Sequence, residues 1–246
     1  FGSTLINNKT YVIASDGDLM EGISHEAMSL AGHLKLKNLI VFFDNNKISI
    51  DGSTSLSVSD NYKKRFEGYG WNFLEINGHN EKQISKAITK ASKASKPTLI
   101  SCKTIIGFGS PNLSGTEKTH GAPLGKDEVK EVKNYLNWNS KPFEVPDEIL
   151  KEWRNIRNKG DKKRKEWLQR LHSSPKSVKF NNYLSNDLNE KFDKKFKSYL
   201  KKLKKDKPKL ATRQSSLNFL EILNTSLENT IGGSADLTGS NLTKTR

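Results

Sequence analysis

The sequence is poor in the features that define several classes of protein. Its single cysteine, Cys102, excludes an internal disulfide framework and favours a reducing compartment, so we expect a cytoplasmic location. No apolar run is long enough to cross a membrane, and no signal or transit peptide is visible. The chain begins with Phe1 and ends with Arg246, and we expect both ends to be truncations of a longer protein.

Acidic residues are scarce beside basic ones, with 27 Asp and Glu against 42 Lys and Arg and a formal net charge of +15. Most of the excess lies within residues 151–210. Such a segment can bind nucleic acid or another anionic surface. It carries no zinc, helix-turn-helix or RNA-binding signature, and its aromatic residues are widely spaced and suit packing. We therefore interpret it as a solvated helical surface and expect no nucleic-acid partner.

Strand-like and helix-like patterns alternate along the first half of the chain. Residues 11–14 and 39–43 are short apolar runs typical of buried strands, and residues 20–36 have the apolar spacing of a helix. The same reading predicts further helices at 58–69, 81–95 and 126–136, strands at 71–76 and 98–102, and a serine-rich loop at 51–60. The alternation predicts an α/β fold, a parallel sheet with helices on both faces.

Oxygen-bearing groups come directly after the first two predicted strands. Asp16 offers a carboxylate, Asn46 offers an amide oxygen thirty residues later, and the backbone carbonyl of Ile48 can be a third ligand. The carboxyl edge of an open α/β sheet is where ligands bind. Three oxygens without a Cys or His cluster suit a hard cation such as Mg²⁺ or Ca²⁺. The alternative is that Asp16 merely caps a helix.

The turn after the first strand also suits a phosphate. Gly17 has no Cβ, so the backbone can approach a phosphate closely. A helix that we expect to begin near Leu19 points its free N–H groups at the same place. Because Mg²⁺ keeps phosphate oxygens and water among its ligands, the pattern predicts a site for a metal-bound diphosphate.

This stretch resembles the thiamine diphosphate motif, in which an Asn follows Gly-Asp-Gly further along the chain. Ser15 stands where the motif has its first Gly, whereas Asp16 and Gly17 match it. The flanking strings at 20–27, 29–36 and 48–52 resemble transketolase. The resemblance implies thiamine diphosphate as cofactor and Mg²⁺ as metal, with Ca²⁺ or Mn²⁺ possible. It assigns the metal to Asp16, Asn46 and Ile48 and the diphosphate to Gly17.

Glu21 has two compatible interpretations. Within the first turn of its predicted helix, its carboxylate interacts favourably with the helix dipole. The resemblance implies a buried glutamate near the cofactor and the subunit interface of a homodimer, where it links two active sites.

Residues 103–125 form a glycine-rich stretch after a predicted strand, and long loops of this kind are often functional. Taken alone, His120 in this stretch is a loop histidine that makes a backbone hydrogen bond. The surrounding sequence, Thr-His-Gly-Ala-Pro-Leu-Gly at 119–125, resembles the transketolase loop whose histidine contacts the cofactor diphosphate and the substrate. The resemblance therefore implies that His120 is catalytic and binds both, since an imidazole can donate hydrogen bonds and move protons near neutral pH.

The last part of the chain resembles the start of the pyrimidine-binding domain of transketolase, with a helix predicted at 217–227 and a strand at 231–237. On that resemblance, Arg213 and Ser240 bind the sugar phosphate and Asp236 lies close to the cofactor; without it they are a surface arginine and ordinary turn residues. The implied domains are a diphosphate-binding domain at 1–175, a basic interdomain connection at 176–209 and a truncated pyrimidine-binding domain at 210–246.

The resemblance implies an enzyme of the pentose phosphate pathway that moves a two-carbon ketol unit from a ketose phosphate to an aldose phosphate. The family's glutamate that activates the cofactor lies beyond Arg246, so we expect the isolated segment to be inactive. Two alternatives stay open. One is another thiamine diphosphate enzyme, either 1-deoxyxylulose-5-phosphate synthase or a 2-oxoacid dehydrogenase subunit. The other is a non-catalytic, basic anion-binding protein.

Overall fold

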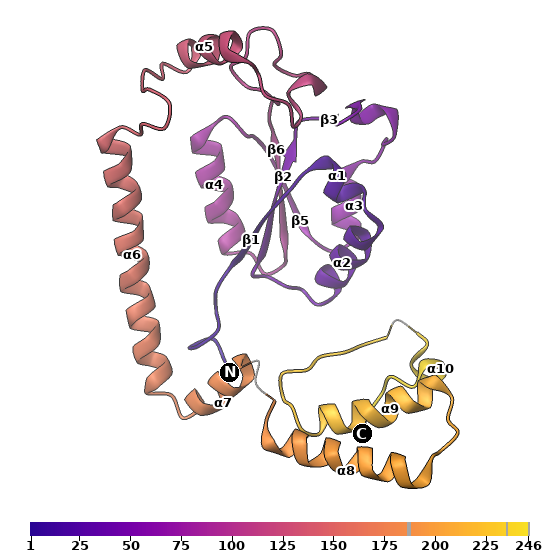
Figure 1. The fold of residues 1–246 in the computed structure, drawn as a ribbon. Helices are drawn as coiled ribbons and strands as arrows, with labels where there is room; N and C mark the ends of the chain where they lie inside the picture. Colours follow the sequence, from indigo (N-terminus) through magenta and orange to yellow (C-terminus); the bar gives the residue numbers. More distant parts are fainter. Residues whose placement is uncertain (186–187, 235, 246) are drawn as a thin grey trace. The chain divides into compact units, whose positions relative to one another are not determined.

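The computed structural model describes residues 1–185, 188–234 and 236–245 and divides into two compact units, each described by itself (Figure 1). The larger unit comprises Gly2 and residues 6–159, and the smaller comprises Phe1, residues 3–5 and residues from 160 onward. The three domains predicted from the sequence have other boundaries, and they stay a prediction about the full-length protein.

A four-stranded parallel sheet forms the centre of the larger unit. Its strands are β1 (Thr10–Ala14), β2 (Leu39–Asn45), β5 (Asn72–Asn77) and β6 (Thr98–Lys103), in the order β1-β2-β6-β5. Val41 of β2 pairs with Val12 of β1 on one side and with Leu99 of β6 on the other. Because all the pairs are parallel, the carboxyl ends of the four strands gather at one edge of the sheet.

Helices cover both faces of this sheet, as predicted. They are α1 (Asp16–Met20), α2 (Gly22–His33) and α3 (Tyr62–Gly68) on one face and α4 (Glu81–Ser92) on the other (Figure 1). Successive side chains of β2 point to opposite faces, so Val41 and Phe43 pack with the first group, whereas Ile40 packs against Ala87 and Ala91 of α4. Both faces of the sheet are therefore buried by apolar contacts.

Near its C-terminal end, α2 lies directly against the turn that leads from α3 into β5. A Cβ atom added at Gly32 would lie 1.8 Å from the carbonyl oxygen of Tyr69, so a side chain cannot be accommodated there. Trp71, which is only 3% exposed, donates its indole N–H to the carbonyl oxygen of Met28 at 2.8 Å. These contacts hold α2 at a fixed distance from the start of β5.

The prediction of one helix over residues 20–36, beginning near Leu19, is wrong. The chain instead forms α1 from Asp16 and α2 from Gly22, separated by Glu21 in an extended conformation. Two carbonyl groups of α1 have side-chain partners in place of a continuing helix. Ser24 Oγ donates to the carbonyl oxygen of Asp18 at 2.5 Å, and Arg65 Nη2 donates to that of Leu19 at 2.8 Å.

Two more local predictions need correction. The helix expected over residues 58–69 begins only at Tyr62, because Asn61 caps it by accepting a hydrogen bond from the backbone N–H of Lys64 at 3.0 Å. The serine-rich stretch 51–60 is not wholly a loop. It contains β4 (Gly52–Ser53), paired with β3 (Ile48–Ser49), and a short 3₁₀ helix, η1 (Thr54–Leu56).

The rest of the larger unit follows β6. The glycine-rich stretch contains a 3₁₀ helix, η2 (Glu117–Thr119), and leads into α5 (Lys126–Tyr135). The long helix α6 (Asp147–His172) begins in the larger unit and ends in the smaller one.

The smaller unit is helical, with α7 (Ser177–Leu184), α8 (Glu190–Asp206), α9 (Thr212–Asn224) and α10 (Thr238–Asn241). Phe192 and Phe196 of α8 stack at 5.5 Å between ring centroids, and Phe219 of α9 meets both edge-on. These contacts confirm that aromatic residues of the basic segment serve packing. In the part of the chain that the structure describes, no helix is both long and apolar enough to cross a membrane.

The strand predicted at 231–237 does not form among the described residues of that stretch; Ala235 lies outside them. A parallel strand needs a neighbouring strand to pair with, and the described part of the smaller unit contains none.

Candidate functional site

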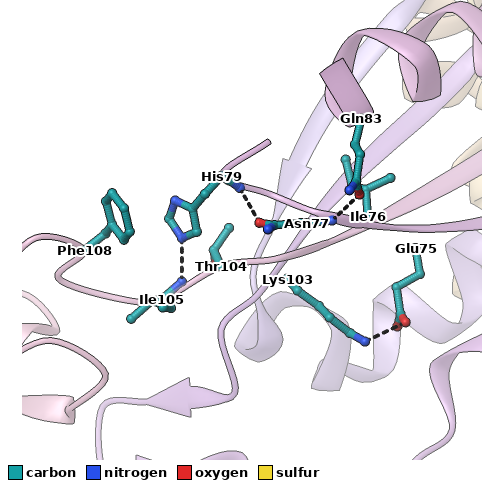
Figure 2. A pocket seen from close by; sticks show the side chains of 9 residues that line it. All are labelled: Glu75, Ile76, Asn77, His79, Gln83, Lys103, Thr104, Ile105 and Phe108. Atoms are coloured by element: carbon teal, nitrogen blue, oxygen red, sulfur yellow. Dashed lines mark hydrogen bonds and ion pairs between the residues drawn. The ribbon is translucent and has the colours of Figure 1, made fainter. Parts of the chain in front are cut away.

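The carboxyl edge of the sheet borders two pockets. One, of about 570 Å³, lies at the ends of β5 and β6 and is lined by residues that include Glu75, Asn77 and Lys103 (Figure 2). The other, of about 600 Å³, is lined by residues that include Lys47 and Tyr62. Lys47 and Tyr62 are neighbours of Asp16, so the second pocket adjoins the metal ligands predicted from the sequence.

Asp16 is a buried carboxylate with an unused oxygen. The residue is 2% exposed, and within the described residues its Oδ2 atom has no hydrogen-bond partner. Burial, assisted by the negative charge of Asp44, raises the pKa of Asp16 to about 6, although a backbone hydrogen bond from Lys47 opposes the shift. An unpartnered buried carboxylate is costly, and a bound cation would remove that cost.

Tyr62 adds a second unsatisfied group beside this carboxylate. Its hydroxyl is buried and lies close enough to Asp16 to interact with that carboxylate, but it forms no hydrogen bond of regular geometry within the described residues. Burial raises the pKa of Tyr62, and the charge of Asp16 raises it further. Sequence analysis missed Tyr62, since a tyrosine in the first turn of a helix gives no signal of a polar role.

Asn46 is held in one orientation by its neighbours. Its Oδ1 atom accepts a hydrogen bond from the backbone N–H of Ile48 at 2.9 Å, and its Nδ2 atom donates to Asp44 Oδ2 at 3.3 Å. Lys47, between Asn46 and Ile48, adopts the left-handed conformation with φ 62° and turns the chain from β2 into β3. The amide oxygen keeps a second lone pair for a ligand.

These groups fit a hard divalent cation. The helix α1, which starts with Asp16, contacts both β2 and β3, and Asn46 lies in the two-residue turn between those strands, just before Ile48 begins β3. The set offers one carboxylate, one amide and one backbone carbonyl, all of them oxygen donors of the kind Mg²⁺ and Ca²⁺ prefer. The described residues contain no group of three or more His, Cys, Asp or Glu that could hold a metal.

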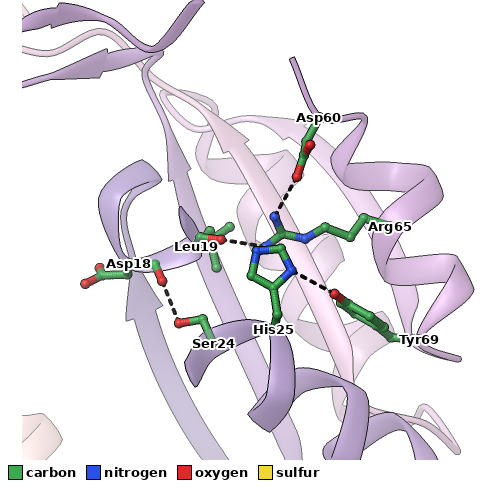
Figure 3. A network of polar contacts seen from close by, with 7 residues as sticks. All are labelled: Asp18, Leu19, Ser24, His25, Asp60, Arg65 and Tyr69. Carbon is green, nitrogen blue, oxygen red and sulfur yellow. Dashed lines mark hydrogen bonds and ion pairs between the residues drawn. The ribbon is translucent and has the colours of Figure 1, made fainter. Parts of the chain in front are cut away.

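A polar network on the sheet face holds α1 in place (Figure 3). Arg65 of α3 donates to the carbonyl oxygen of Leu19 through Nη2 and pairs with Asp60 at 3.0 Å through Nη1. His25 Nδ1 lies 3.0 Å from the hydroxyl of Tyr69, which joins α2 to the same helix. Arg65 is therefore a supporting residue that the sequence alone did not reveal, because its partner lies 46 residues away.

The residues at the start of α1 are held by hydrogen bonds and open to one side. Ser15, which replaces the first Gly of the motif, donates to Asp18 Oδ2 from its backbone N–H at 2.7 Å and from its hydroxyl at 2.8 Å. These bonds lower the pKa of Asp18. A Cβ atom added at Gly17 would meet no atom within 4 Å, so there is free space for a ligand beside its backbone. Glu21 is exposed in this chain.

The loop that carries His120 is anchored at its base. Glu128 of α5 accepts hydrogen bonds from the backbone N–H of Asn112 at 2.9 Å and from the hydroxyl of Ser110. Thr104 donates to Asp44, whose other oxygen accepts from Asn46. One end of the loop is thus bonded to the surroundings of the predicted metal ligands.

His120 itself is exposed and follows η2. Its backbone N–H donates to the carbonyl oxygen of Glu117 at 2.8 Å, and no hydrogen bond or ion pair of its imidazole occurs within the described residues. The imidazole is therefore free to meet a ligand, and its catalytic role stays a prediction.

The other predicted site residues belong to the smaller unit. Arg213 Nη1 donates to the backbone carbonyl oxygen of Ser240 at 3.4 Å, so these two residues lie together, and both are exposed. Asp236 is exposed as well. Their roles toward a sugar phosphate and a cofactor stay predictions.

Comparisons with known proteins agree on one family. Residues 1–196 match the family model described as "Transketolase, thiamine diphosphate binding domain". A transketolase of Rhodobacter capsulatus is 45% identical over 100% of this chain, which covers 37% of that relative. The chain therefore spans little more than a third of the length of the curated relatives it matches.

Solved structures give the same result. A transketolase from Campylobacter jejuni superposes with a TM-score of 0.86 at 39% identity, covering 99% of this chain and 37% of that one. A transketolase from Pichia stipitis in complex with sedoheptulose-7-phosphate superposes with a TM-score of 0.85 at 36% identity, covering 98% of this chain and 36% of that one.

Proposed function

This chain belongs to the transketolase family, and from that premise we propose that the protein containing it transfers a two-carbon ketol unit from a ketose phosphate to an aldose phosphate. The observation that carries the proposal is the buried carboxylate of Asp16, whose unpartnered Oδ2 atom lies where the first strand of the sheet ends. A group in that state favours a cation, and a cation there can neutralise a diphosphate.

Asp16, Asn46 and the carbonyl oxygen of Ile48 would hold Mg²⁺, for which Ca²⁺ or Mn²⁺ can substitute, and Gly17 leaves space for the diphosphate. When bound, thiamine diphosphate supplies the carbanion chemistry of ketol transfer. The protein's task is then to orient the cofactor and to balance its charge.

His120 would donate a hydrogen bond to a phosphate or sugar oxygen and move a proton near neutral pH. Arg213 and Ser240 would bind the sugar phosphate, because a guanidinium grips phosphate oxygens in pairs and a hydroxyl adds one more bond. Asp236 would lie near the cofactor. Glu21 would also lie near the cofactor, at the subunit interface of a homodimer. The protein would be cytoplasmic.

The test uses the full-length protein after removal of divalent ions with a chelator. We expect ketol transfer from xylulose phosphate to an aldose phosphate to require both thiamine diphosphate and Mg²⁺. Turnover of pyruvate in place of the sugar phosphate would assign the protein to another class of thiamine diphosphate enzyme. Absence of transfer from either donor would refute the proposal.

The isolated 246-residue chain provides a second arm of the experiment. We expect it to give no turnover, because the resemblance places the residue that activates the cofactor beyond Arg246. Robust ketol transfer by this chain alone would contradict that expectation.

A further inference from the structure

The turn that follows β5 contacts the start of the glycine-rich loop in the pocket shown in Figure 2. His79 Nε2 accepts a hydrogen bond from the backbone N–H of Ile105 at 3.0 Å. The same imidazole stacks on Phe108, with ring centroids 4.0 Å apart and planes 21° apart. One side chain therefore contacts two positions at the start of the loop.

The turn that carries His79 is itself fixed. The backbone N–H of His79 donates to Asn77 Oδ1 at 2.9 Å, and the backbone N–H of Asn77 donates to Gln83 Oε1 at 2.9 Å. A Cβ atom added at Gly78 would lie 2.4 Å from Thr104 Cγ2 and 3.1 Å from the carbonyl oxygen of Lys103. The imidazole thus projects from a rigid turn packed closely against the end of β6.

The segment held by His79 in turn supports the part of the loop that carries His120. The backbone N–H of Gly115 donates to the carbonyl oxygen of Ile106 at 2.8 Å. Gly107 lies so close to Thr119 that an added Cβ atom would be 2.8 Å from Thr119 Cγ2. A shift of residues 105–107 would therefore displace the residues immediately before His120.

We propose that His79 is a positioning residue, which holds the loop so that His120 meets the cofactor and substrate. The inference rests on the proposed function, because it assigns His79 a part in the same site. His79 acts through Ile105 and Phe108 and contacts neither ligand. Its Nε2 atom accepts a hydrogen bond, so the ring is neutral with its proton on Nδ1.

The first test measures backbone amide exchange in the full-length protein. Replacing His79 with Leu should speed exchange of the Ile105 amide about tenfold, the factor expected for loss of one hydrogen bond, and should speed exchange at residues 115–120 as well. His79→Gln should restore protection at Ile105, since its Oε1 atom can accept in place of Nε2. His33→Gln, on the exposed end of α2, is the matched control. Wild-type protection in His79→Leu would overturn the proposal.

The second test asks whether His79 acts through His120. Because a misplaced catalytic group costs rate, we expect His79→Leu to lower kcat about tenfold. In a His120→Ala background the same substitution should change kcat less than about twofold, since residues that act through one another are not additive. Equal effects in both backgrounds would show that His79 acts independently of His120, and would overturn the positioning role.

Two controls separate the possible failures. Phe108→Leu keeps the hydrogen bond and removes the ring contact, so exchange at 115–120 should rise less than in His79→Leu. A melting temperature close to that of the wild type would show that the variants fold. If the protein has no ketol transferase activity, the proposed function fails, and the exchange measurements alone decide whether His79 positions the loop.

Discussion

The two ends of one sheet edge differ in how their polar groups are satisfied. At the β5–β6 end, the groups find partners within the chain: Lys103 pairs with Glu75 at 2.7 Å, and His79 accepts from Ile105. At the β1–β2 end, the buried Asp16 Oδ2 and the Tyr62 hydroxyl are close enough to interact but form no hydrogen bond of regular geometry with each other or with any other described residue. The first region satisfies its polar groups internally, whereas the second leaves buried oxygens for the cation that we propose it binds.

Under the proposed function, this difference marks a place where folding stability is given up for ligand binding. A buried carboxylate that lacks a partner opposes folding, and natural proteins retain such groups mainly at functional sites. Pocket size alone would not separate the two ends, since their volumes are about 570 and 600 Å³. The buried oxygens without a regular hydrogen bond, which occur at the β1–β2 end, do distinguish the two ends.

The largest expected effect comes from removing the buried charge. In the full-length protein, Asp16→Asn should weaken binding of Mg²⁺ with thiamine diphosphate by about 100-fold or more, since loss of a direct ligand should cost at least what loss of an outer-shell partner does. Isothermal titration measures this. Asp127→Asn, a change at an exposed residue of α5, is the control. Equal affinity of both variants for Mg²⁺ with thiamine diphosphate would show that Asp16 is not a ligand.

Removing the arginine that supports α1 should have the next largest effect. Arg65→Ala removes the hydrogen bond to Leu19 and the pairing with Asp60, so the free energy of unfolding should fall by about 2–4 kcal/mol. Urea denaturation measures it. Arg154→Ala, an exposed change in α6, should have almost no effect. A similar loss in both variants would mean that Arg65 has no special role.

The pH dependence of stability sharpens the comparison further. The pKa of Asp16 is about 6 in the folded chain against an ordinary value of 3.8 for an exposed aspartate, so the folded state holds a proton that the unfolded state releases between these values. Without divalent ions, this residue makes the fold less stable as pH rises from 4 to 7, by at most about 3 kcal/mol.

The measurement compares urea denaturation of the wild type and Asp16→Asn across that pH range, with a chelator present. The difference in unfolding free energy between them should change with pH and level off above pH 7, while Asp18 and Glu128, whose pKa values are lowered, contribute equally to both. A difference independent of pH would contradict the raised pKa.

The smallest effect concerns the space beside Gly17. Gly17→Ala should leave the unfolding free energy within about 1 kcal/mol of the wild type, since an added Cβ atom meets nothing and alanine favours helix. Affinity of the full-length protein for thiamine diphosphate should nevertheless fall about tenfold if the diphosphate lies against this backbone. Gly22→Ala, which also faces open space, is the control.

Much of the larger unit was predictable from local patterns. The apolar runs of β1, β2 and β6 and the periodicity of α4 predicted a parallel sheet with helices on both faces. Because parallel strands share one edge, the same patterns predicted that Asp16 and Asn46 lie near each other there, and in the structure Asp16 is a neighbour of Lys47, the residue after Asn46. Local sequence was sufficient for these features because each depends on residues close together in the chain.

Features that depend on distant contacts were not predictable. At the break between α1 and α2, Arg65 donates to the carbonyl oxygen of Leu19 from another helix, a contact that local patterns do not reveal. The strand expected at 231–237 had the right composition, but its formation requires a partner strand. The contact of His79 with Ile105 likewise joins segments that only the folded sheet brings together.

The close approach of Gly32 to Tyr69 lies beside Trp71, whose fluorescence can report on the contact between α2 and the start of β5. Since backbone meets backbone there, α2 cannot slide past the start of β5, and a displacement of one must carry the other. The indole of Trp71 lies at that junction, bonded to Met28 and shielded from water. In a variant in which the other three tryptophans are replaced by Phe, the emission of Trp71 should therefore stay constant when the nearby helices move as one body, and should shift to longer wavelength only if they separate.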